Sequence, residues 1–147
     1  MAAQPKSKPR PKWIIDLHGI KEALTTRSNA KAQILDAIQS GEMLVMRSVQ
    51  HELKDLYEHL WGDFVAIKGK KYVDTPVAVS AVAGQLQEAH GSSVLGGIPS
   101  FAHFEAVALA RTKQLKLVSA GKGLSDCKQI ASKCGLPATD IIDISGV

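Results

Sequence analysis

The stretch Lys12-Trp13-Ile14-Ile15-Asp16 decides the fold class of this chain of 147 residues. Its centre is apolar and β-branched and its last residue is acidic, which predicts a short buried strand that ends in an aspartate. Similar apolar runs recur at 43–46, 115–119 and 141–144. Helical patterns separate these runs, and strands that alternate with helices indicate a parallel sheet with helices on both faces. The sequence therefore predicts an α/β fold.

The segments between the expected strands carry helix signals. Gly41 suits a helix C-cap, and Ser48 and Ser125 are expected to cap the helices that follow them. The predicted helices, their edges set by periodicity and breakers, cover 25–39, 48–60, 76–89, 100–113 and 125–135. Loops are expected at His18-Gly19, at 90–98 and at Gly121-Lys122-Gly123, and 64–68 is open between a helix extension and a short strand.

Composition fits one domain. The chain is 45% hydrophobic and 22% charged, close to globular averages. Residues 1–11 alternate prolines with basic residues and predict a disordered arm, so the folded domain is expected over 12–147. No apolar run reaches the length of a membrane span or of a signal peptide. Cys127 and Cys134 are too far apart on one helix to pair. These features favour a cytoplasmic protein with no membrane partner and with reduced cysteines.

The basic residues allow an interaction with phosphate groups without requiring it. Formal net charge is +4, with basic residues in the arm and in the cluster of Lys68, Lys70 and Lys71. A simple solvated surface is an equally good interpretation of these lysines. Aromatic residues make up only 5% of the chain, which disfavours a base-stacking platform for single strands.

Two polar residues stand where parallel α/β folds bind ligands, and a third lies at the edge of the apolar stripe of a helix. Asp16 and Ser119 each end an expected strand, and ligands bind beyond the carboxyl ends of such strands. Asp16 is then a metal ligand or, alternatively, a helix cap. Glu52 flanks the apolar stripe of its helix, where a carboxylate needs a partner or a metal. Its alternative role is to stabilise the helix dipole from the first turn.

The helix predicted over 100–113 adds a histidine. His103 shares one face with Ala106 and Ala110, whose small side chains let the helix lie close to the sheet. Glu105 points roughly 200° away from His103 on the helical wheel, which favours a surface position. Asp126 is expected in the first turn of the last helix, where an acid stabilises the dipole. Whether Glu105 or Asp126 supplies a further acid to the site stays open.

Taken together, these segments resemble the PIN domain, a nuclease fold found in many toxins and RNA-processing enzymes. The matching pieces are Ile14-Ile15-Asp16, the helix start at 48–53 with its Glu-Leu, and the Ala-rich helix 102–110 followed by the strand 115–119. The segments 41–61 and 133–136 also resemble a PIN-like subfamily linked with toxin–antitoxin loci. The resemblance implies a three-layer α/β/α fold with a central parallel sheet of four or five strands.

The acidic cluster departs from the family pattern. Asp16 and Glu52 match its first two acids. His103 stands in the place of the third acid and Gly121 in the place of the fourth. Gly123 stands where a further acid is frequent, and His18 occupies the neighbourhood of the usual asparagine.

The resemblance implies a divalent-metal-dependent endoribonuclease with a weakened active site, acting as the toxin-like component of a toxin–antitoxin pair. Asp16, Glu52 and His103 would hold Mg²⁺ or Mn²⁺, with His103 as ligand or proton carrier and Ser119 positioning water or ligand. Its partners would be RNA and an antitoxin protein, and a homodimer is among the assemblies it allows. The alternative is an inactive PIN-like module that binds RNA or a partner protein through its arm and lysines.

A third class of function is a small-molecule or nucleotide binder on the same sheet. Gly121-Lys122-Gly123 lies before a predicted helix, so its backbone N–H groups suit a phosphate. A glycine-rich turn alone is a weak signal for that function.

Overall fold

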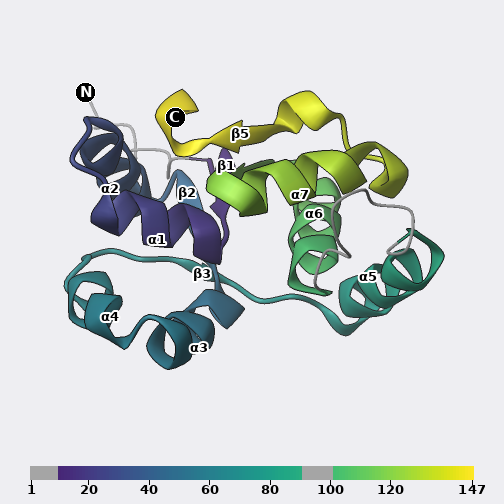
Figure 1. Cartoon of the computed structure of the whole chain (residues 1–147), viewed down its shortest axis with the longest axis horizontal. Helices are drawn as coiled ribbons and strands as arrows, with labels where there is room; N and C mark the ends of the chain where they lie inside the picture. Colours follow the sequence, from purple (N-terminus) through teal and green to yellow (C-terminus); the bar gives the residue numbers. More distant parts are fainter. Residues whose placement is uncertain (1–9, 91–100) are drawn as a thin grey trace, which may run out of the picture.

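The computed structural model describes residues 10–90 and 101–147 and has an α/β architecture (Figure 1). All its strand pairs are parallel. The strands are β1 (Trp13–Ile15), β2 (Met43–Met46), β3 (Tyr72–Val73), β4 (Lys116–Ser119) and β5 (Ile141–Asp143). The α-helices are α1 (Leu17–Thr25), α2 (Ala30–Ser40), α3 (Arg47–Leu56), α4 (Glu58–Val65), α5 (Val77–His90), α6 (Phe101–Lys113) and α7 (Gly121–Ala131). Short 3₁₀ helices are η2 (Ser132–Cys134), η3 (Ala138–Asp140) and η4 (Ile144–Gly146).

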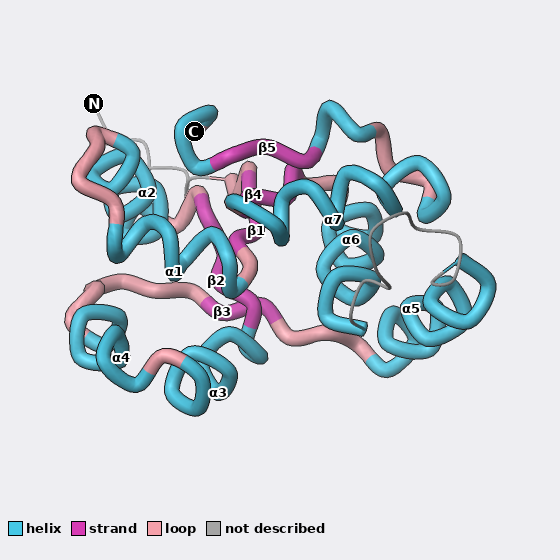
Figure 2. Tube along the Cα trace, viewed as in Figure 1, coloured by secondary structure: helices cyan, strands magenta, loops and turns pink. Residues whose placement is uncertain are grey.

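The sheet order is β3-β2-β1-β4-β5, and the helices flank this sheet in a three-layer α/β/α arrangement (Figure 2). The chain runs from β1 outward through β2 to β3, and then returns to the other side of β1 for β4 and β5. The strand order therefore reverses between β1 and β4, where open α/β sheets bind ligands. Ile15 is paired with Val118 at this point. Asp16 and Ser119 consequently end two neighbouring strands.

The central strands are buried on both sides. Ile14, Ile15, Leu117 and Val118 are fully excluded from solvent, as expected for a parallel sheet between helix layers. Helix α6 packs against β4 through a buried surface that includes Ala106. The predicted close approach of this alanine-rich helix to the sheet is therefore confirmed.

The prediction of a fold with four or five parallel strands is confirmed, and so are several local expectations. Gly41 adopts a left-handed conformation at the C-cap of α2, with φ of 83°. The helix expected over 76–89 is α5, and the strand expected over 141–144 is β5.

The loop expected at His18-Gly19 is wrong. Helix α1 begins directly after β1 because Asp16 acts as its N-cap and accepts a hydrogen bond from the Gly19 backbone N–H. The next helix accordingly begins at Ala30 rather than at Thr25.

The single helix expected over 48–60 is also wrong. Helix α3 begins at Arg47 with no side-chain cap, so Ser48 does not cap it. Tyr57, with φ of −135° and ψ of 55°, separates α3 from α4. Phe64 and Val65 end α4, which decides between the two alternatives for 64–68 in favour of the helix extension. The two-residue strand β3 follows and was not predicted.

The glycine-rich segment after β4 is helical and not a loop. Gly121, Lys122 and Gly123 form the first turn of α7, whose N-cap is Ala120. Ser125 therefore lies inside the helix instead of capping it. The helix ends at Ala131, η2 follows, and Gly135 closes the segment with φ of 80°.

Two expectations lie wholly or mostly outside the described residues. The basic arm falls there except for Arg10 and Pro11, which are exposed. The loop expected at 90–98 falls there except for His90, which ends α5. In 10–90 and 101–147, none of the helices combines the length and apolarity of a membrane span.

Candidate functional site

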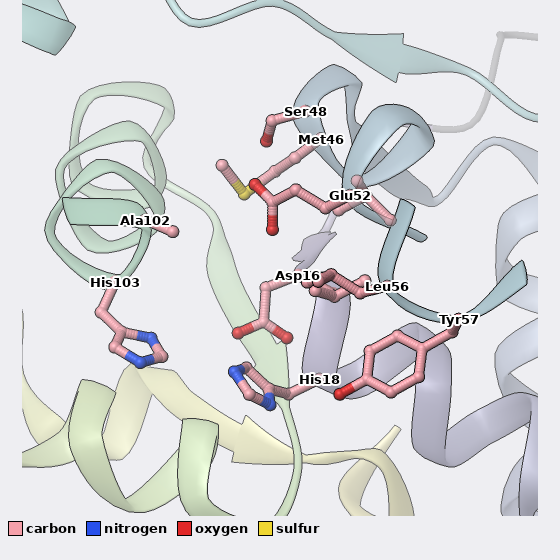
Figure 3. Close-up of a pocket in the computed structure, with 11 residues that line it drawn as sticks. Asp16, His18, Met46, Ser48, Glu52, Leu56, Tyr57, Ala102 and His103 are labelled. Carbon is pink, nitrogen blue, oxygen red and sulfur yellow. The ribbon is translucent and has the colours of Figure 1, made fainter. Parts of the chain in front are cut away.

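A pocket of about 190 Å³ opens at the carboxyl end of β1 (Figure 3). It lies between the first turns of α1 and α6 and the length of α3. Its lining residues are Asp16, Leu17, His18, Met46, Ser48, Val49, Glu52, Leu56, Tyr57, Ala102 and His103. Three of the four predicted site residues are therefore in the lining, and Ser119 is not.

Asp16 is 6% exposed, and both of its carboxylate oxygens accept hydrogen bonds. The Gly19 backbone N–H donates to Oδ1 over 2.8 Å, and the Ser119 hydroxyl donates to Oδ2 over 2.7 Å. Burial raises the pKa of Asp16, while the bonds from Gly19 and Ser119 oppose that rise. Ser119 itself is fully buried. It therefore positions Asp16 and does not face the pocket.

Glu52 extends from α3 with its carboxylate directed toward Asp16 (Figure 3). Burial raises its pKa, and the charges of Glu105 and Asp16 raise it further. Glu105 is half-buried on α6. Burial raises its pKa, and a side-chain hydrogen bond with Thr75 opposes that rise. The expected surface position of Glu105 is therefore wrong: it is a third carboxylate within electrostatic reach of Glu52.

His103 is 8% exposed, and its two ring nitrogens face different partners. Nδ1 lies 3.7 Å from Cys127 Sγ, and Nε2 lies 3.5 Å from Asp126 Oδ2. Burial lowers the pKa of His103, and His18, whose ring stacks on it with centroids 5.5 Å apart, adds to that effect. The Asp126 charge opposes the shift. The ring is therefore held between the Cys127 thiol and the Asp126 carboxylate.

Among the described residues, one group of side chains lies close enough together to hold a metal ion. Asp16, His103 and Cys127 each offer one ligand atom, and these atoms lie within 4.8 Å of one another. All three residues are buried. Glu52, predicted as a metal ligand with Asp16 and His103, lies outside this cluster and across the pocket from it.

The first turn of α7 closes the site from the side of His18. A Cβ at Gly123 would lie 2.4 Å from the His18 ring, so only glycine lets the ring pack there. Gly121 has φ of 56°, and a Cβ there would meet nothing within 4 Å. The segment that was expected to cradle a phosphate is thus the helix start against which His18 rests.

Of the three lysines in the basic cluster at 68–71, two are exposed and one is engaged by the protein itself. Lys68 and Lys71 are exposed, but Lys70 is half-buried. Its ammonium group donates to the backbone carbonyls of Val65 and Ile67. Lys70 therefore satisfies carbonyl groups at the end of α4 and is not available to a ligand in this conformation.

The prediction from sequence missed Cys127 as a neighbour of the site. It left Asp126 open as a further acid and gave His18 only as the residue in the neighbourhood of the usual asparagine. Asp126 and Cys127 lie in the middle of α7, whereas the sequence predicted Asp126 in a first turn. Gly123 and Cys127 are four residues apart in sequence. Because α7 begins at Gly121 and includes both of them, they share one helical face. That spacing is the signal that could have placed Cys127 beside the glycine on which His18 packs.

No protein-family model matches the sequence, and no curated protein matches it. Solved structures are similar in fold. A chain in the structure of FitAB bound to an IR36 DNA fragment matches with a TM-score of 0.59 and 13% identity, covering 90% of this chain and 94% of that one. PAE2754 from Pyrobaculum aerophilum matches with a TM-score of 0.56 and 13% identity, covering 92% of each chain. At this identity the likeness shows the fold, which is PIN-like.

Proposed function

We propose that this chain is the PIN-like member of a toxin–antitoxin pair and cleaves RNA with a divalent cation bound in the pocket. The observation that carries the proposal is the approach of Glu52 to Asp16 at the strand-order reversal. Each carboxylate has a raised pKa, and for Glu52 the Asp16 charge is one cause. A bound cation would offset the cost of burying two ionised carboxylates and the repulsion between them.

The donor set fits one ion. Asp16 and Glu52 offer carboxylate oxygens, which Mg²⁺ and Mn²⁺ prefer, and the His103 imidazole favours Mn²⁺. A second ion would need further acids, and His103 and Gly121 stand where the PIN resemblance has them. When bound, the ion would lower the pKa of a water and offset charge that develops at phosphorus.

The chain's own residues have distinct tasks in this proposal. Ser119 and the Gly19 N–H hold the Asp16 carboxylate in place with bonds of 2.7 Å and 2.8 Å. Glu52 would bind the ion from the opposite wall of the pocket. His103 is kept neutral by its lowered pKa. Its Nε2 faces Asp126, so its Nδ1 would either bind the ion or carry a proton near the reacting phosphate, and not both at once.

The antitoxin partner is proposed from the likeness to FitAB, a toxin–antitoxin system whose structure contains DNA. A free toxin chain and its complex should then differ in activity.

The test is RNA cleavage by the purified chain with Mn²⁺, with Mg²⁺ and with a chelator. We expect cleavage with Mn²⁺ that exceeds cleavage with Mg²⁺. Asp16→Asn should reduce it by roughly 100-fold or more, because even outer partners of a metal site cost roughly 10- to 100-fold. Asp36→Asn, an exposed aspartate on α2, is the matched control and should keep full activity.

One observation favours a second function, an inactive module that binds RNA or a partner protein. Both Asp16 oxygens already accept hydrogen bonds, so the site is satisfied without an ion. If the free chain cleaves no RNA with either metal, and Asp16→Asn leaves RNA or partner binding intact, the second function replaces the first.

A further inference from the structure

The ring of His103 is oriented as in a histidine that binds a metal through Nδ1. Metal-binding histidines usually present the other ring nitrogen to a carboxylate, which fixes the tautomer. Here Asp126 lies 3.5 Å from Nε2 and favours the proton on that nitrogen. The Nδ1 lone pair then faces the side where Cys127 lies.

Distances within the cluster suit a tetrahedral ion of the zinc type. Zinc binds nitrogen at about 2.0–2.1 Å and sulfur at about 2.3 Å, which at a tetrahedral angle separates the two atoms by about 3.6 Å. His103 Nδ1 and Cys127 Sγ are 3.7 Å apart. The Asp16 carboxylate completes three ligands within 4.8 Å of one another, so closing on an ion requires shifts of about 1 Å.

The supporting bonds around these ligands are already made. Ser119 and the Gly19 N–H orient the Asp16 carboxylate, and Asp126 faces His103. Partners of this kind raise the affinity of zinc ligands and fix their direction. The fourth position would face the pocket, whose lining includes Asp16 and His103 but not Cys127.

A cysteine nucleophile is the other function that a Cys–His–Asp arrangement suggests, and it does not fit. Cys127 is fully buried, and no pocket described for residues 10–90 and 101–147 reaches it. Burial also raises the pKa of its thiol well above the ordinary value. A nucleophilic cysteine needs an exposed thiolate, whereas a metal displaces the thiol proton to solvent on binding.

We propose that Asp16, His103 and Cys127 form a Zn²⁺ site whose fourth position opens into the pocket. This site does not depend on RNA cleavage and goes beyond the carboxylate site of Asp16 and Glu52. The thiolate selects a softer ion than Mg²⁺. Because the two sites share Asp16 and His103, Zn²⁺ and the ion proposed for catalysis compete.

The test uses the full chain, stripped of metal and titrated with Zn²⁺ against a chromophoric chelator, and with Co²⁺ followed by absorbance. We expect one Zn²⁺ per chain and a thiolate-to-cobalt charge-transfer band. Cys127→Ser should abolish the band, and Asp126→Asn should weaken Zn²⁺ binding by roughly 10- to 100-fold while the chain stays folded. Cys134→Ser is the matched control, because Cys134 is also buried and free but lies outside the cluster.

The proposal is overturned if the wild-type chain shows no thiolate band with Co²⁺. It is also overturned if Cys127→Ser and Cys134→Ser retain or lose the band equally. The three side chains would then be a neutral hydrogen-bonded group in the core. Thermal unfolding with and without Zn²⁺ separates lost binding from lost folding, and Asp126→Asn keeps the proposal testable if Cys127→Ser does not fold.

Discussion

Asp16 holds two elements with one carboxylate. Its Oδ1 caps α1 through Gly19, and its Oδ2 accepts the Ser119 hydroxyl at the end of β4. A helix cap contributes typically about 1 kcal/mol. The cap is the structural alternative to a metal-binding role, yet here it fixes the direction of the group that such a role needs. The two interpretations of Asp16 are therefore compatible.

The Ser119–Asp16 bond should contribute more to stability than an equivalent bond at the surface. Ser119→Ala leaves a buried carboxylate oxygen without its donor, and we expect a loss of about 1–3 kcal/mol. Ser145→Ala is the matched control, because the Ser145 hydroxyl also donates to a carboxylate, that of Asp143, at an exposed site. Its loss should be within about 0.5 kcal/mol.

Denaturant unfolding of the two variants checks this expectation. Equal losses for Ser119→Ala and Ser145→Ala would mean that water replaces the buried donor. The Asp16 carboxylate would then be less rigidly held than its two hydrogen bonds indicate.

At the scale of single elements, the first turn of α7 contains two glycines that differ sharply in the space they leave for a side chain. Gly121 has φ of 56° and open space for a Cβ, and aspartate and asparagine tolerate that conformation better than most residues. An acid there also complements the helix dipole. We expect Gly121→Asp to change stability by no more than about 1 kcal/mol.

Because Gly121 stands at the fourth acidic position of the PIN resemblance, Gly121→Asp should also bind Mn²⁺ more tightly than the wild-type chain. Gly121→Asn, of the same shape without the charge, is the control. Titration calorimetry measures the difference. If the two variants bind Mn²⁺ equally, Gly121 is not the position of the missing acid.

Gly123→Asp should behave differently. Its Cβ would lie 2.4 Å from the His18 ring, so the ring or the helix must move, at a cost of about 1–3 kcal/mol. A stability loss at Gly123 similar to that at Gly121 in thermal unfolding would contradict this packing.

The same segment shows where sequence patterns suffice and where they do not. The strands 43–46 and 115–119 could be located from apolar runs alone, since burial on both faces requires such runs. Glycines and a serine in 121–125 indicated a loop and a cap by local propensity. Packing of His18 on Gly123 and the start of α7 at Gly121 override that propensity. The two-residue strand β3 is too short to carry any pattern.

The candidate site divides in the same way. A strand end and a helix face, which follow from periodicity, pointed to Asp16 and Glu52, and the PIN resemblance added His103 to them. The structure brings all three to one pocket. Cys127 and Asp126 depend on the crossing of α6 and α7, which brings residues 24 positions apart in sequence within 3.7 Å. The four-residue spacing of Gly123 and Cys127 places both on one face of a helix, but no local pattern encodes which helix that face meets.

At the scale of the whole molecule, the fold concentrates negative charge at one place. Asp16 follows β1, Glu52 lies on α3 and Glu105 lies on α6, and burial raises the pKa of each. A parallel sheet with its order reversed at β1 and β4 creates this meeting point, whatever chemistry occurs there. Ionising these buried carboxyl groups at neutral pH therefore lowers the stability of the folded chain.

This cost has a definite sign with pH. A carboxyl group whose pKa is raised by folding binds more protons in the folded than in the unfolded state, so stability falls as pH rises from its ordinary pKa through its raised pKa. For Glu52 the ordinary value is 4.5. In protein stripped of divalent cations, Glu52→Gln should therefore gain thermal stability over the wild-type chain at about pH 7 and not at about pH 4.

Thermal unfolding of both proteins at the two pH values measures this gap. Glu88→Gln, an exposed glutamate on α5, corrects for the loss of one negative charge from the molecule. A gap for Glu52→Gln that is the same at both pH values would show that the side-chain amide changes packing and that charge is not the cause. A gap that opens only as pH rises would mean that the ionised Glu52 is held at a cost that a bound cation can relieve.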